Sequence, residues 1–236
     1  MNFHYNLRMT TLFIATRNRH KVGEIGAILG PRFRLLTLND FPAAPKVVED
    51  ADTFAGNAMK KAVELAKWLA DSSLVIPLSP LFVLADDSGL EVDALDGAPG
   101  VHSARFAAMD SGRLDNSSDA DNNAKLLRLL KNVPPEKRSA RFHCVLALAA
   151  VPAGRIEVAS PVCYADESEP QTFDGVCEGR IVFEPRGTNG FGYDPLFVPG
   201  GYEQTFAELG EEAKNQLSHR ARALAKLKEF FNDRKR

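Results

Sequence analysis

An alternation of short apolar runs with helical patterns is the feature that most constrains the fold of this chain. Thr11–Thr16 (TLFIAT) is a short apolar run typical of a buried strand. A polar loop follows, and apolar residues then recur at helical spacing until Gly30-Pro31 ends the helix. The order strand, loop, helix is the repeating unit of α/β proteins.

The remaining strand and helix patterns change their order along the chain. Further strands are predicted at Arg34–Leu38, Leu81–Ala85, Ala140–Val151, Ile156–Ala165 and Gly175–Phe183. Further helices are predicted from Thr53 as the N-cap to about Ala70, over Asp119–Lys131, and from about Ser218 to Asn232. Ordered loops are predicted at Leu95–Ser103 and Pro185–Asp194. Helices alternate with strands early and strands run together later, which predicts an α/β fold with a mixed sheet.

Composition excludes several classes of protein. A length of 236 residues predicts one domain or two closely joined lobes, and 29 Lys+Arg against 31 Asp+Glu argue against a general nucleic-acid coat. No apolar run reaches the roughly 18 residues of a membrane span, and the N-terminus has no signal-peptide pattern. Cys144, Cys163 and Cys177 lack CxxC spacing, so reduced thiols in the cytoplasm are expected rather than disulfides or a zinc site.

A polar loop, Thr16-Arg17-Asn18-Arg19-His20-Lys21, follows the first predicted strand. In open α/β sheets ligands bind at the carboxyl ends of strands, where a helix N-terminus and a lysine favour anions. The loop lacks the glycines of the known phosphate-loop motifs. An ordinary polar turn between strand and helix therefore remains the alternative.

Two adjacent carboxylates, Asp86 and Asp87, follow the strand predicted to end at Ala85. Buried together they would repel each other, and a divalent cation would remove that repulsion. Successive strand residues point to opposite faces, so one carboxylate is expected to face the cleft and the other to hold backbone amides of a turn. Glu49, in another acidic loop, is a candidate second ligand. The alternatives are an Asp-rich turn and a solvated loop charge.

Two later segments also carry candidate binding groups. In PRGTNGFGYDP, Gly187, Gly190 and Gly192 allow close ligand approach, the two aromatic residues offer a stacking face, and the aspartate can accept hydrogen bonds from a base. Ser218 is a good N-cap, and three cationic or ionisable side chains, His219, Arg220 and Arg222, fall in the first turn, which is the unfavourable end of the helix dipole unless an anion is bound there. A structural turn and a solvated basic face are the alternatives.

Together these parts form the inventory of a nucleoside triphosphate site, and their sequences resemble a known family. The matching stretches are LFIATRNRHK, TFAGNAMKKA, ADDSGLEVDALDGAPGVHSARFA, ARFHCVLAL, GRIVFEPRGTNGFGYDP and KNQLSHRARAL, between about Leu12 and Leu227. The chain resembles the inosine triphosphate pyrophosphatase family, which removes dITP, ITP and XTP from the nucleotide pool.

The resemblance implies Mg²⁺-dependent hydrolysis of a purine nucleoside triphosphate to the monophosphate and pyrophosphate. It assigns the triphosphate to Thr16, Arg17, Asn18, Arg19, His20 and Lys21, the metal to Glu49 and Asp87, further substrate contacts to Ser88 and Lys214, and the base to Phe191, Gly192, Tyr193, Asp194, His219 and Arg220. Asp87 would accept the proton of the attacking water, and Lys21 would stabilise the leaving group. It also implies an elongated mixed sheet flanked by helices, two lobes around a central cleft, and a homodimer that binds neither nucleic acid nor membranes.

The chain departs from the family pattern at several positions. Arg17 replaces the usual Gly, Gly56 stands where many members have Glu, and His102 replaces the usual Tyr. We expect residues 1–10 to be an N-terminal extension, 11–232 a single catalytic domain and 233–236 a basic tail, with Met9 as an alternative start.

Two other functions remain open at this point. The chain could be a non-catalytic nucleotide-binding module that kept the pocket, or a related septum-type pyrophosphatase that acts on modified pyrimidine nucleotides. Tight binding without turnover would indicate the first, and turnover of dTTP or UTP would indicate the second.

Overall fold

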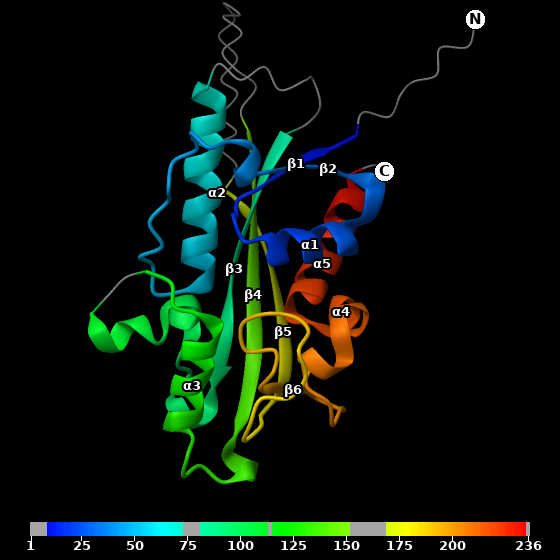
Figure 1. Ribbon diagram of the computed structural model, residues 1–236. Coiled ribbons are helices and arrows are strands. Elements are labelled where there is room, and N and C mark those ends of the chain that lie inside the picture. Colours follow the sequence, from blue (N-terminus) through cyan, green and yellow to red (C-terminus); the bar gives the residue numbers. More distant parts are fainter. Residues whose placement is uncertain (1–8, 73–80, 113–114, 152–168, 235–236) are drawn as a thin grey trace, which may run out of the picture.

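The computed structural model describes residues 9–72, 81–112, 115–151 and 169–234, and one mixed sheet organises them (Figure 1). Its strands, in the spatial order β2-β1-β3-β4-β5-β6, are β1 Thr11–Ile14, β2 Arg34–Thr37, β3 Leu81–Val92, β4 Ser139–Ala150, β5 Gln171–Ile181 and β6 Phe197–Pro199. β1 pairs in parallel with β2 and β3, whereas the pairs from β3 to β6 are antiparallel. The predicted α/β fold with a mixed sheet is confirmed.

Helices cover both faces of the sheet. In the described part of the chain the α-helices are α1 Arg19–Leu29, α2 Phe54–Asp71, α3 Asp119–Leu129, α4 Phe206–Leu217 and α5 His219–Asp233. α2 packs on β3 and β4, and α5 packs on β4 and β5 from the other side, next to α1 and α4 (Figure 1). No helix among the described residues is long and apolar enough to cross a membrane.

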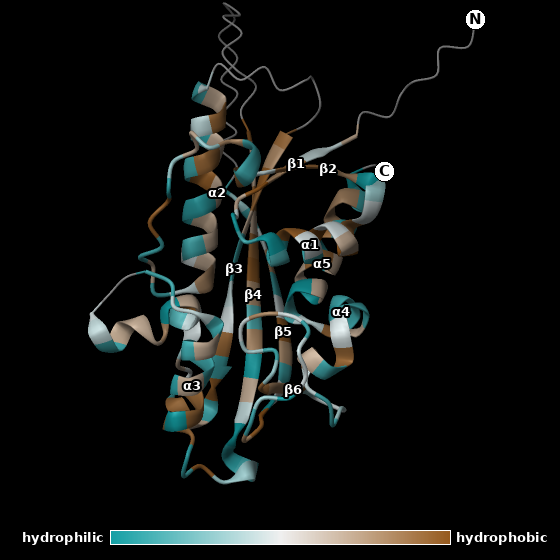
Figure 2. Cartoon of the chain, in the orientation of Figure 1, coloured by the Kyte–Doolittle hydropathy of each residue, from teal (hydrophilic) through white to brown (hydrophobic). Residues whose placement is uncertain are grey.

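The hydrophobic core is divided at the middle of β3. Upstream of the division, Val83 and Ala85 pack with α2, while Leu84 packs with α1 and α5. Downstream, Leu90 belongs to a separate core shared with α3, β6 and α4. Figure 2 shows the upper part of β3 in brown, the colour of hydrophobic residues. The segment Asp86–Gly89 therefore forms a polar belt between apolar cores, and this belt positions the candidate site.

Several expected boundaries are wrong. The strand expected to end at Ala85 continues to Val92, because Asp86 and Asp87 pair with Leu146 and Val145 of β4 instead of starting a turn. β5 begins four residues before the expected Gly175, and β6 and α4 have no counterpart in the prediction. The strand expected at Ile156–Ala165 lies outside the described residues, as does Cys163. Cys144 and Cys177 are buried free thiols, as predicted.

Close contact between α5 and β5 depends on Gly175. A Cβ atom added there would lie 2.1 Å from the carbonyl oxygen of His219 and 2.6 Å from the amide nitrogen of Ala223. Both are backbone atoms of α5, so a side chain at this position would push the whole helix away.

Gly175→Ala is accordingly expected to lower the free energy of unfolding by about 3 kcal/mol, the upper range for overpacking. Gly23→Ala is the matched control, because a Cβ there has no neighbour within 4 Å and alanine favours helix α1. Urea unfolding should show Gly23→Ala neutral or up to about 1 kcal/mol more stable. Equal stability of the two variants would contradict this account of helix packing.

Candidate active site

Asp86 and Asp87 lie at the middle of β3 and face opposite sides of the sheet. Strand side chains alternate, so Asp86 points with Leu84 towards α1 and α5, while Asp87 points with Ala85 towards α2. Only 2% of Asp86 and 7% of Asp87 is exposed to solvent. Each carboxylate therefore needs its own means of compensating the loss of water.

Cations from α1 and α5 compensate Asp86. The Nζ atom of Lys21 lies 2.5 Å from its Oδ1, and the Nε atom of Arg220 lies 2.7 Å from its Oδ2. The Ser88 hydroxyl and the Cys144 thiol also donate hydrogen bonds to this carboxylate. Burial alone would raise the pKa of Asp86, but the charges of Arg220 and Lys21 hold it well below its usual value. Asp86 is a fixed anion that positions two cations, which corrects the expectation that it holds the backbone of a turn.

The ion pairs continue from Asp86 to the loop Pro185–Asp194, which we call the glycine-rich loop. Glu24 of α1 pairs with Arg220 and, at 2.8 Å, with Lys214 of α4. Lys214 also contacts Asp194 at 2.5 Å, and Asp194 accepts the backbone N–H of Phe191 at 2.8 Å. We call the five side chains Asp86, Arg220, Glu24, Lys214 and Asp194 the ion-pair ladder. The ladder connects Asp86 on β3, where Lys21 is also bound, to the glycine-rich loop that carries Phe191.

Asp87 has a different environment on the α2 face. Burial, and to a lesser extent the negative charge of Glu49, raise its pKa to about 6 although Lys61 and Lys21 oppose the shift. Lys61 of α2 contacts Glu49 at 3.1 Å and donates to the Asp86 carbonyl oxygen at 2.9 Å. The Oδ2 atom of Asp87 is buried without a hydrogen-bond partner. This carboxylate has capacity left for a ligand.

The two carboxylates of Asp87 and Glu49 suit a cation that takes its other ligands from elsewhere. Within the described residues no group of three or more His, Cys, Asp or Glu is close enough to hold a metal ion. Mg²⁺ commonly binds one or two protein carboxylates and completes its shell with phosphate oxygens and water. The unpartnered oxygen of Asp87 fits this donor set.

The loop before α1 is held in place by its own side chains. Asn18 caps α1, because its Oδ1 accepts the backbone N–H groups of His20 at 2.9 Å and Lys21 at 3.2 Å. The Thr16 hydroxyl accepts the backbone N–H of Asn18. Arg17 donates to the carbonyl oxygens of Leu38 and Ala44, so its guanidinium supports the fold next to the loop.

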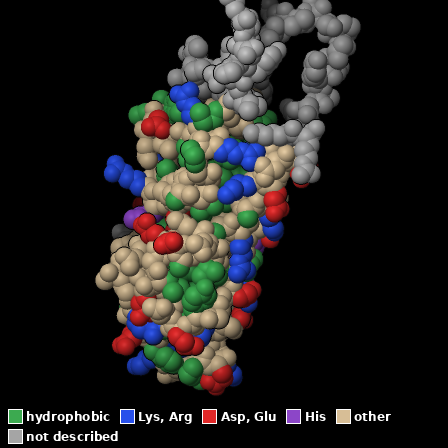
Figure 3. Space-filling model, turned by 90° about the vertical axis from the view of Figure 1, so that its right-hand side faces the viewer, with side chains coloured by type: hydrophobic (Ala, Val, Ile, Leu, Met, Phe, Trp, Pro, Cys, Tyr) green, Lys and Arg blue, Asp and Glu red, His purple; other side chains and the backbone are tan. Residues whose placement is uncertain are grey.

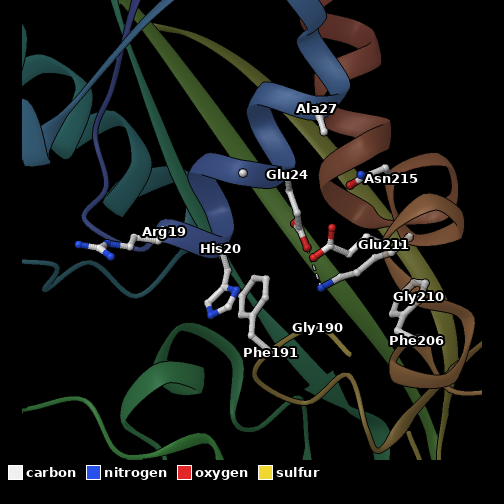
Figure 4. Close-up of a pocket in the computed structure, with 12 residues that line it drawn as sticks. Arg19, His20, Glu24, Ala27, Gly190, Phe191, Phe206, Gly210, Glu211 and Asn215 are labelled. Atoms are coloured by element: carbon white, nitrogen blue, oxygen red, sulfur yellow. Dashed lines mark ion pairs between the residues drawn. The ribbon is translucent and has the colours of Figure 1, made fainter. Parts of the chain in front are cut away.

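A pocket of about 190 Å³ lies between α1, α4 and the glycine-rich loop (Figure 4). The ring of His20 stacks on that of Phe191 at its edge, with centroids 5.2 Å apart. The ammonium group of Lys214 lies 4.2 Å from the Phe191 centroid. Arg19 also lines the pocket, but Figure 4 shows its side chain pointing away from His20 and Phe191.

The remaining predicted base contacts are more deeply buried. Tyr193 is 4% exposed and donates its hydroxyl to the Ser103 carbonyl oxygen, so its ring belongs to the core. His219 stacks on Phe142, and burial together with Arg220 and Lys214 holds its pKa well below the usual value.

Glycines fix the path of the loop that carries Phe191. Gly192 has φ +62°, and its backbone N–H donates to Asp119. At Gly190, φ is +78° and a Cβ would lie 2.2 Å from the Asp194 carboxylate. A side chain would clash with Asp194 and would strain the backbone, so this turn requires glycine at position 190.

Reasoning from the sequence missed two residues of the site, Glu24 and Lys61. Lys61 had a visible signal, because it lies on the same helical face as Ala58, Ala62 and Leu65, where a charge is out of place unless it is paired. The only sequence signal for Glu24 was its position about one helical turn after Lys21. Its partners lie 190 and 196 residues away in the sequence, and no local pattern reveals them.

A mixed sheet with two oppositely facing buried carboxylates at its middle, buried cations beside one of them and a pocket with aromatic side chains between α1, α4 and the glycine-rich loop defines an α/β protein with a polar site suited to a small anionic ligand. The chain belongs to the Ham1 family, whose family model matches residues 12–230.

Curated relatives and solved structures agree with this assignment. The chain is 49% identical over 224 residues to the dITP/XTP pyrophosphatase of Geobacter sulfurreducens, covering 94% of this chain and 97% of the relative. It is 46% identical over 222 residues to that of Desulforamulus reducens, covering 94% and 95%. The Ham1 protein structure from Coxiella burnetii is similar with a TM-score of 0.73, 35% identity and coverage of 95% and 100%.

The raised pKa of Asp87 predicts a stability effect. The folded pKa of about 6 exceeds the usual 3.8, so the protonated form is favoured by folding and this contribution is lost as the pH rises through 6. In metal-free buffer, Asp87→Asn should raise the free energy of unfolding at pH 7.5 by roughly 2 kcal/mol. Urea titrations should show the gain vanish below pH 4, and a gain independent of pH would contradict the account.

Asp86→Asn is the matched substitution one residue away, and the opposite result is expected. It removes the anion of Lys21 and one of the two anions of Arg220, which then keeps only Glu24, and breaking these buried pairs costs about 3–5 kcal/mol. The same urea titrations at pH 7.5 should therefore show a large loss of stability. A neutral effect would remove Asp86 from its role as the anchor of both cations.

Proposed function

We propose that this protein is a Mg²⁺-dependent pyrophosphatase that hydrolyses dITP, ITP and XTP to the monophosphate and pyrophosphate, so that deaminated purines stay out of DNA and RNA. The names of the curated relatives support the substrate class. The observation that carries the reaction type is the back-to-back pair on β3. Asp87 has a free carboxylate oxygen, and Lys21, which Asp86 holds in place, is near enough for its charge to lower the pKa of Asp87.

Asp87 is the proton acceptor in this mechanism. Attack of water on a phosphorus atom requires a positioned nucleophile and neutralisation of charge rather than a covalent intermediate on the protein. In the metal-free site, with a pKa of about 6, the Asp87 carboxylate is a stronger base than an ordinary aspartate and is still mostly ionised at neutral pH. Lys21 binds the phosphate chain and stabilises negative charge on the pyrophosphate leaving group.

Glu49 and Asp87 are the residues that would hold Mg²⁺. The metal, when bound, supplies positive charge to the triphosphate and lowers the pKa of a coordinated water. Lys61 keeps the two carboxylates from repelling each other before substrate arrives, because it contacts Glu49 and lowers the pKa of Asp87.

The ion-pair ladder supplies the base selectivity. A 6-keto purine presents an acceptor at O6, which suits buried donors such as Lys214 and Arg220. Adenine presents an amino group there and would leave a buried donor unpaired. The loop from Phe191 to Asp194, with His219, frames the ring, and Ser88 contacts the substrate next to Arg220.

The proposal extends to the oligomeric state and the cellular compartment of the protein. We propose a homodimer, and the exposed rings of Phe183 and Tyr202 are available to a partner subunit. Acidic and basic side chains are interspersed on the α1, α4 and α5 side (Figure 3), which offers little to nucleic acid. The substrate pool and the free thiols suit the cytoplasm.

A substrate panel tests the proposed function directly. With Mg²⁺, the protein should release pyrophosphate from dITP and XTP much faster than from ATP or dTTP. Equal turnover of ATP and dITP would contradict the selectivity. Orthophosphate as the direct product would contradict the reaction type, and preferred turnover of dTTP or UTP would indicate the pyrimidine-directed alternative.

Asp87→Asn tests the proton acceptor. Turnover of dITP should fall by at least about 100-fold, the lower range for loss of a general base, with nucleotide affinity less affected. Glu136→Gln, an exposed carboxylate far from the site, is the control and should turn over like the unmodified protein. Tight binding of dITP by the unmodified protein without turnover would instead favour the non-catalytic module.

A further inference from the structure

His20 stacks on Phe191, and both residues line the pocket. The two ring planes differ by only 19°, and Figure 4 shows the two rings next to each other. His20 belongs to the first turn of α1, whereas Phe191 belongs to the glycine-rich loop. The two rings contact each other in the free protein, so a flat ligand ring can stack between them only when one of them moves aside.

The backbone and side chain of His20 both point to a role other than phosphate binding. Its N–H already donates to the Asn18 side chain, so that amide is not available to an anion. Consecutive residues on a helix diverge by about 100°, and Lys21 is directed to Asp86. The imidazole of His20 therefore faces the glycine-rich loop, while Lys21 faces the buried carboxylate of Asp86.

Of the two partners of the Phe191 ring, His20 is the one that can move. Lys214 is 3% exposed and fixed by Glu24 and Asp194. His20 is exposed and can rotate about two side-chain torsions without disturbing the ladder. A ligand ring can enter on the His20 side without breaking a buried ion pair.

We propose that the purine base stacks between His20 and Phe191, so that His20 is a base-binding residue and the second wall of the base slot. This rests on the proposed function and deepens it. Stacking depends on the size and flatness of the ring and discriminates little between exocyclic groups. His20 therefore raises the affinity for all purines, while the choice between hypoxanthine and adenine stays with the buried donors.

Two probes separate the base from the phosphates. Calorimetry with Mg²⁺ should compare the binding of dIMP and of inorganic tripolyphosphate to the unmodified protein, His20→Ala and His20→Phe. His20→Ala is expected to weaken dIMP binding about 10-fold, the loss of one stacking face, and to leave tripolyphosphate binding unchanged. His20→Phe keeps a flat ring and should restore most of the dIMP affinity.

Each other result overturns the proposal. Unchanged or tighter dIMP binding by His20→Ala would mean that the imidazole only covers Phe191 in the free protein. A loss confined to tripolyphosphate would return His20 to the phosphate site, and failure of His20→Phe to restore binding would exclude stacking. If the unmodified protein binds dIMP but releases no pyrophosphate from dITP, the proposed function fails while this proposal stands.

Discussion

The buried carboxylate of Asp86 is the interaction on which the site depends. Its two cations come from α1 and α5, so one side chain on the central strand draws both helices to the same point of the sheet. Buried ion pairs contribute little net stability, because desolvation offsets the attraction. Their effect is to fix geometry, and here they orient Lys21 and Arg220 while Asp87 is left free on the opposite face.

The same arrangement explains why the site lies at the middle of the sheet and not at a strand end. The apolar cores on either side of Asp86–Gly89 provide rigid packing above and below a short polar belt. Polar groups in that belt are shielded from water, which strengthens the electrostatic effect that they would have on a charged ligand. Alternation along β3 then separates a structural anion from a chemically available one without any change in the backbone.

The sequence predicted those strands, helices and site residues that short stretches of neighbouring residues are enough to identify. The strand at Thr11, the helix capped by Thr53 and the candidate residues Lys21, Asp87 and Phe191 were visible as short motifs. The continuation of β3 was missed because polar residues inside a strand resemble a turn until their partners are known, and Arg220 lies 134 residues from Asp86. α4 was missed because Gly210, with φ +80°, interrupts its helical period.

Hydrolysis in water enriched in ¹⁸O tests most directly whether this site activates water against the phosphorus next to the nucleoside. The account predicts that dITP is cleaved with one ¹⁸O atom in dIMP and none in the pyrophosphate, as read by mass spectrometry of both products. Incorporation of ¹⁸O into pyrophosphate would place the attack on the β-phosphorus and contradict the assignment of Asp87 and Lys21.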